Sequence, residues 1–72
     1  MSQVDAILDH LRTGATITPA EALELCGSLA LHSRIAELRA MGYHPQKQMR
    51  AGNGHRWGEY SLPIEECAIA HG

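Results

Sequence analysis

The sequence has no phenylalanine, one tryptophan and two tyrosines among its 72 residues, so aromatic rings contribute little to its core. Bulky filling must come instead from eight leucines and five isoleucines. Folding of so short a chain buries only about 60% of the surface that the unfolded chain exposes, which is too little to build two separate cores. We therefore expect one small domain with a thin aliphatic core.

Signals for a membrane, for export, for a disulfide scaffold and for a metal site are also missing. No stretch approaches the roughly 18 apolar residues of a bilayer span, and no basic segment followed by an apolar run opens the chain. Cys26 and Cys67 form no CxxC pair, and the five histidines form no HxxxH or HExxH pattern. We expect a cytoplasmic protein with reduced thiols and with no metal or other cofactor.

A catalytic constellation is absent as well. No serine or cysteine has a general base at a spacing that would activate it, and a domain of this size has little room for an enclosed pocket. We expect the protein not to be an enzyme.

Charge is small overall but unevenly distributed. Six basic residues against eight acidic ones give a net charge of −2, which lacks the basic excess of many nucleic-acid-binding proteins. Residues 30–56, however, carry five basic residues against one acidic, whereas the segments 1–29 and 57–72 are both acidic. Local potential rather than net charge attracts a polyanion, so the middle of the chain is the candidate binding region.

The first helix is predicted over residues 3–12. Ser2 followed by Asp5 resembles a capping box, and apolar residues recur at helical spacing behind it. Gly14 is a natural stop, and residues 15–17 form an extended link that could pair as an edge strand.

A second helix is predicted over residues 19–26, because Thr18 is a good N-cap, Pro19 suits the first helical position and Glu21 suits the third. Gly27 then interrupts the pattern. Two helices joined by a short turn that contains glycine are typical of a helix-turn-helix.

The third helix is expected to be capped by Ser28 and to end at Gly42. Leu31, Ile35 and Leu38 fall on one face of this helix, which predicts that they point into the core.

A β-hairpin is predicted after the helices, from an extended segment over residues 43–49, turn residues at 51–54 and a second strand over 56–62. Asn53 is expected to take a positive φ. Tyr60 shares strand parity with Leu62 and is the expected core residue. Trp57 has the opposite parity, which leaves it to pack on the tail or at an interface.

The segments TPAEAL at 18–23 and RIAELRAMGY at 34–43, with Tyr60 and Leu62 at the end of the hairpin, resemble the small winged helix-turn-helix proteins of bacteriophages and prophages. The fold expected is α+β, a three-helix helix-turn-helix core followed by a β-hairpin wing, over residues 1–62 with a tail at 63–72. The resemblance implies sequence-dependent binding of double-stranded DNA as a transcriptional regulator or accessory factor.

The DNA-contacting residues are expected on the third helix and beside the wing turn. On the helix, Ser33 and Glu37 face outward, with Arg34 on one flank and His32 and Arg39 on the other. On the wing, the cations Lys47, Arg50 and Arg56 would hold the sugar-phosphate backbone, or would only keep an exposed hairpin edge from pairing.

A different class of function stays open, in which the winged helix docks a host or phage replication or transcription protein. The acidic first two helices and the outward Leu29 and Ala40 favour it. A homodimer is also expected, because a single module with few cations binds DNA weakly. Its predicted interface is the C-terminal segment around Ile64, Cys67, Ala68 and Ile69, a segment that Trp57 could adjoin. Truncation after Leu62 would then leave a folded monomer.

Overall fold

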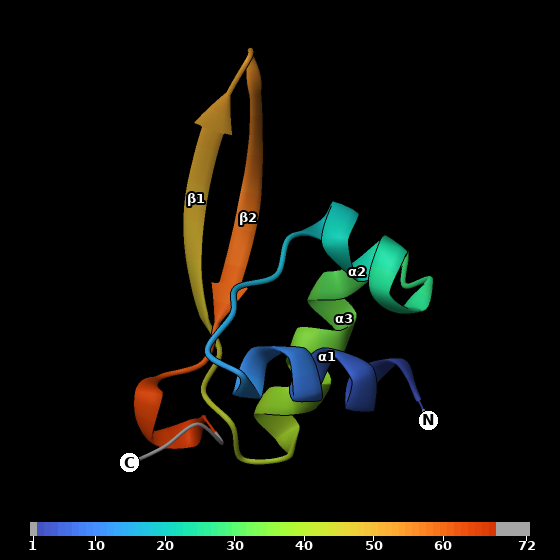
Figure 1. The fold of residues 1–72 in the computed structure, drawn as a ribbon, viewed down its shortest axis with the longest axis vertical. Helices are drawn as coiled ribbons and strands as arrows, with labels where there is room; N and C mark the ends of the chain where they lie inside the picture. The colour runs from blue at the N-terminus through green and yellow to red at the C-terminus, as the bar shows by residue number, and fades with distance from the viewer. Residues whose placement is uncertain (1, 68–72) are drawn as a thin grey trace.

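Three short helices form the body of the molecule, and a long two-stranded hairpin stands out from it (Figure 1). The computed structural model describes residues 2–67. Its elements are α1 (Gln3–Arg12), α2 (Pro19–Cys26), α3 (Leu31–Ala40), β1 (Gln46–Gly52), β2 (His55–Ser61) and the 3-10 turn η1 (Ile64–Glu66). The expected three-helix core followed by a β-hairpin wing is confirmed.

Both N-caps predicted for the first two helices are present. The Ser2 hydroxyl accepts a hydrogen bond from the Asp5 N–H at 3.2 Å. At α2 the exchange is reciprocal, because the Thr18 hydroxyl accepts from the Glu21 N–H while the Glu21 carboxylate accepts from the Thr18 N–H. These bonds satisfy amide groups that have no partner within the helix.

The predicted cap of α3 is wrong. Ser28 is buried, and its hydroxyl has no hydrogen-bond partner among the described residues. Its N–H, like that of Gly27 at φ 73°, donates back into the last turn of α2. Ser28 therefore completes α2, and α3 begins only at Leu31, with Ala30 in the N-cap position.

The strands of the hairpin lie closer to the turn than predicted, because the turn has two residues rather than four. Asn53 and Gly54 take φ values of 51° and 78°, as a tight turn between right-twisted strands requires, and the positive φ expected of Asn53 is confirmed. The first strand, β1, therefore extends to Gly52 and not only to residue 49, and it begins only at Gln46. The register pairs Lys47 with Tyr60 and Arg50 with Trp57.

A single antiparallel bridge ties the hairpin to the helical body. Ile17 and Tyr60 exchange two backbone hydrogen bonds, both 2.9 Å long. The edge strand predicted over 15–17 is thus reduced to one residue pair. Since Ile17 directly precedes the cap of α2, the bridge places the base of the hairpin beside the start of that helix.

The core is aliphatic, as expected, and Tyr60 is its one aromatic ring among the described residues. α1 packs against both α2 and α3. The predicted inward positions on α3 are all buried. The buried apolar side chains are Ile7, Leu8, Leu11, Ile17, Ala22, Leu31, Ile35, Leu38, Tyr60 and Leu62.

Trp57 lies on the opposite face of β2 from Tyr60. It is half-buried and lines a groove of about 550 Å³ together with Thr18, Pro19 and Glu59. Its partner is therefore the start of α2 and not the tail, because η1 lies at the base of the hairpin (Figure 1).

The described part of the tail is packed against the body. Cys67 is half-buried against the core. Glu66 accepts a hydrogen bond from the His44 N–H at 2.7 Å, and its other carboxylate oxygen lies 2.5 Å from Nδ1 of the same residue. These contacts hold the pKa of the Glu66 carboxyl below its usual range. Ala68 and Ile69, which belong to the predicted dimer segment, lie outside the described residues.

This contact predicts a pH-dependent loss of stability in Glu66→Gln. A carboxyl whose pKa is lower in the folded state stabilises the fold above the pKa of the unfolded chain, and that contribution disappears as pH falls through the lowered value. Urea unfolding should show Glu66→Gln less stable than wild type at pH 7, and the difference should shrink as pH falls toward 3 and Glu66 becomes protonated. Glu65→Gln, a neighbouring exposed carboxylate, is the control, and an equal deficit at both pH values would contradict the prediction.

Candidate nucleic-acid interface

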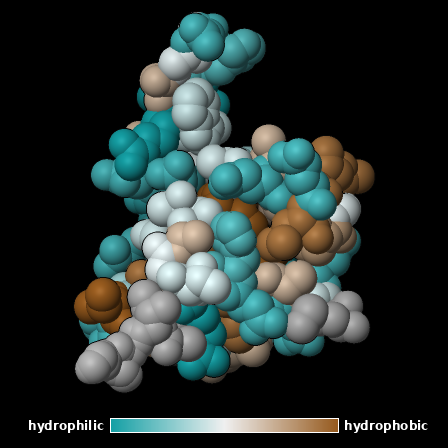
Figure 2. All heavy atoms as spheres, in the orientation of Figure 1, coloured by the Kyte–Doolittle hydropathy of each residue, from teal (hydrophilic) through white to brown (hydrophobic). Residues whose placement is uncertain are grey.

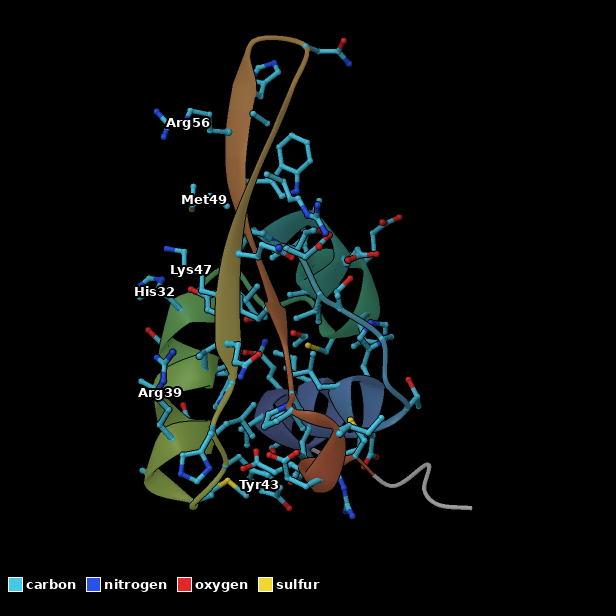
Figure 3. All side chains as sticks on the ribbon, turned by 90° about the vertical axis from the view of Figure 1, so that its left-hand side faces the viewer. His32, Arg39, Tyr43, Lys47, Met49 and Arg56 are labelled. Carbon is cyan, nitrogen blue, oxygen red and sulfur yellow. The ribbon has the colours of Figure 1, made fainter. Side chains whose placement is uncertain are left out.

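One flank of α3 faces the wing. His32 and Arg39 lie seven positions apart on this flank, and both are exposed. The Arg39 Nη2 donates to the Pro45 carbonyl at 3.2 Å, which links the end of α3 to the segment that leads into β1. Figure 3 shows His32 and Arg39 on the same side of the molecule as Lys47, Met49 and Arg56 of the hairpin.

The other flank of α3 faces α1. Arg34 pairs with Glu37 one turn later at 2.5 Å, and its Nη1 donates to the Gln3 side chain at 3.3 Å. The Arg34 side chain is only 28% exposed. The structure therefore separates Arg34 from His32 and Arg39 and places it in a contact between α3 and α1, with Glu37 as its partner on α3.

The centre of the exposed side of α3 carries small side chains. Ala36 and Ala40 are exposed there, Ser33 is half-buried, and Glu37 is engaged by Arg34. Base edges are read by polar groups that reach the groove floor, such as the guanidinium of arginine or the amide of asparagine. This surface offers only the Ser33 hydroxyl and the Glu37 carboxylate for that purpose.

The two faces of the wing differ in charge. Lys47 is paired with Tyr60 across the two strands, and Arg56 lies four positions before Tyr60 on β2. Both therefore point to the same face as Tyr60, which is the face that continues from α3. Arg50 lies on the opposite face, where its Nε donates to the Glu59 carboxylate at 3.0 Å. Of the three predicted wing cations, Lys47 and Arg56 are thus without a carboxylate partner in the described structure, and Arg50 is neutralised.

The Lys47 side chain passes over Gly58, where the absence of a side chain leaves room for it. Its Cε would lie 2.7 Å from a Cβ built on Gly58, closer than real contacts allow. The chain then passes to the Tyr60 ring, whose centre is 5.9 Å from the ammonium nitrogen. The long lysine side chain is therefore laid across β2 toward α3.

A hollow of about 190 Å³ joins the two elements. It is bordered by residues of the helix-turn-helix and of the wing, namely Pro19, Leu29, His32, Lys47, Gly58 and Tyr60. We call it the α3–wing hollow. The start of α3 beside it has no side-chain cap and no acidic residue in its first turn. Its free N–H groups and the positive end of the helix dipole favour an anion here.

Two members of this face were not among the predicted DNA-contacting residues. Met49 is 53% exposed between Lys47 and Arg56, and Leu29 is 88% exposed in the turn before α3. Met49 lies two positions after Lys47 on β1 and so points to the same face, but which face this is becomes known only from the register of the hairpin. Leu29 was predicted to face outward, but as part of a helix rather than of the turn.

Other kinds of site find no support in residues 2–67. No group of histidine, cysteine and acidic side chains there could hold a metal ion. Within the same range no helix has the length and apolar character needed to cross a membrane.

Comparison with known proteins gives one match. The family described as the winged helix-turn-helix domain matches residues 2–64. No curated protein and no solved structure matches the chain.

The two flanks of α3 predict different effects of arginine removal. Arg34→Ala should lower the free energy of unfolding by about 1 kcal/mol, because it breaks a partly exposed ion pair and a hydrogen bond between α3 and α1. Arg56→Ala, which removes an exposed arginine from the wing, should leave it unchanged. Chemical denaturation of both variants measures the difference, and equal stabilities would show that Arg34 does not support the helix packing.

Proposed function

We propose, because the chain belongs to the winged helix-turn-helix domain family, that it binds double-stranded DNA with α3 in the major groove and the wing on the sugar-phosphate backbone. The family is typically a non-enzymatic, DNA-binding domain. The proposal concerns which surface of this chain makes the contact and how.

A single observation carries the assignment of the surface. Three cations, Lys47 and Arg56 of the wing and Arg39 of α3, lie on one face together with His32 (Figure 3), and in the described structure none of the three pairs with a carboxylate. Cations that are not neutralised within the protein are available for phosphates. A chain with a net charge of −2 thus presents one cationic face.

The contacts we propose fall into two groups. Lys47, Arg56 and Arg39 bind phosphates, together with the free N–H groups at the start of α3. Ser33, His32 and Glu37 meet the major groove, where the Glu37 carboxylate can accept from a cytosine amino group. Arg34 and Arg50 lie outside this set, because they pair with Glu37 and Glu59. Phosphate contacts outnumber groove contacts in this arrangement, so we expect strongly salt-dependent binding.

The biological role we propose is that of a transcriptional regulator or accessory DNA-binding factor of a bacteriophage or prophage. The support for it is the resemblance of the segments 18–23 and 34–43, and of Tyr60 and Leu62 at the end of the hairpin, to proteins of that kind.

Titration of labelled duplexes, taken from fragments of the genome that encodes the protein, tests the proposal at low and high salt. Lys47→Ala and Arg56→Ala should each weaken binding to all sequences and reduce the slope of log Kd against log salt concentration by about 1, the effect of one lost phosphate contact. Arg50→Ala is the matched control, because it removes the same charge from the opposite face of the same hairpin. Its slope should change less.

Absence of binding at any salt concentration would contradict DNA binding, and an equal effect of all three substitutions would contradict the assigned face. The first outcome favours a second candidate function, the docking of a replication or transcription protein. Figure 2 shows apolar side chains gathered over α2, where Leu23 and Leu25 are about half exposed. A partner that is lost in Leu23→Ser but kept after nuclease treatment would support that function.

We also propose that the protein forms a homodimer through its C-terminal segment, which would double its contact with DNA. Ile64 is 78% exposed in η1 and is the outward apolar residue of that segment, whereas Cys67 turns toward the core.

Sedimentation of Ile64→Ser should therefore show a monomer where the wild type is a dimer. This substitution tests the interface more directly than truncation after Leu62, which would also remove Glu66 from His44. A wild-type chain that stays monomeric at high micromolar concentration would contradict the dimer.

A further inference from the structure

The turn between α2 and α3 exposes a large apolar side chain at the start of the proposed DNA-reading helix. Leu29 is 88% exposed, more than any other large apolar residue described. Residues before and after it are directed inward, since Ser28 is 2% exposed and Leu31, the first residue of α3, is 4% exposed. The backbone on both sides is thus anchored, and only the Leu29 side chain projects.

This leucine belongs to the cationic face. It borders the α3–wing hollow together with His32 and Lys47. A protein partner of apolar character would have to accept the uncompensated lysine beside it. A polyanion, by contrast, would satisfy the lysine with a phosphate while it brings its own apolar groups to the leucine. The charge around Leu29 therefore favours DNA as the occupant of this surface.

Only one base presents a methyl group in the major groove of unmodified DNA, and that base is thymine. Apolar contact with the thymine methyl is the way in which a side chain without polar atoms can read sequence. On α3 the polar groups that could read bases are few, because Ser33 is half-buried, Glu37 is paired with Arg34, and Ala36 and Ala40 have no polar side-chain atoms. Leu29, in the turn before α3, can add a base contact that the side chains of α3 do not provide.

We infer that Leu29 reads thymine, by contact of its side chain with the C5-methyl group in the major groove. The inference rests on the proposed function and adds the preferred base to it.

Replacement of thymine by uracil tests this inference. The two bases offer the same hydrogen-bonding groups, and they differ only in the methyl. The fragment bound most tightly in the salt titration is amplified with dTTP or with dUTP, and the affinities of both products are measured by competition. Wild type should bind the uracil product roughly three- to fivefold more weakly for each methyl contacted, the worth of one buried carbon group.

Leu29→Ala should bind both products alike, with an unchanged salt slope, because the phosphate contacts remain. Since Leu29 is almost fully exposed, this substitution leaves the core intact, and circular dichroism verifies that the variant is folded. Leu25→Ala, which truncates an exposed leucine outside the hollow, is the matched control and should keep the wild-type preference for thymine.

The outcomes separate the two proposals. If neither product is bound at any salt concentration, DNA binding fails, and the inference fails with it. If wild type binds both products equally, DNA binding stands and the reading of thymine is overturned. Retention of the preference in Leu29→Ala would also overturn it, because the preference would then arise from another residue or from the shape of the DNA.

Discussion

Burial of Tyr60 is the constraint on which the arrangement of the wing depends. A two-stranded hairpin has no core of its own and is at best marginally stable in isolation, so the body of the molecule must hold it. Tyr60 provides that support twice, with its ring in the core and with two backbone hydrogen bonds to Ile17. Because side chains alternate along a strand, burial of this ring also decides where every other side chain of the hairpin points.

The electrostatics of the molecule follow from this orientation. With Tyr60 inward, Lys47 and Arg56 share the face that continues from α3, while Arg50 is carried to the opposite face and meets Glu59. The acidic side chains of the wing and of α3 are thus neutralised by cations that take no part in the exposed face. The result is a cationic surface on a chain that is acidic overall, which a residue count alone does not reveal.

The elements that the sequence predicted well are those whose signals are local. Thr18 and Glu21 cap α2 through atoms of residues only three positions apart. The helical spacing of Leu31, Ile35 and Leu38 already defines the inward face of α3. Prediction failed where two local interpretations competed. Ser28 is a plausible cap for the helix after it, but its N–H completes the helix before it. Asn53 and Gly54 make the whole turn, although the residues before them also suit a turn.

The sequence by itself determined the order of the elements, the inward side chains and the concentration of basic residues between positions 30 and 56. Tertiary structure alone decided which of those basic residues stay free. Arg34 reaches Gln3 from a distant part of the chain, and Arg50 meets Glu59 only because a two-residue turn sets the register between β1 and β2. Such pairings depend on how helices pack and strands align, and no pattern of neighbouring residues contains that information.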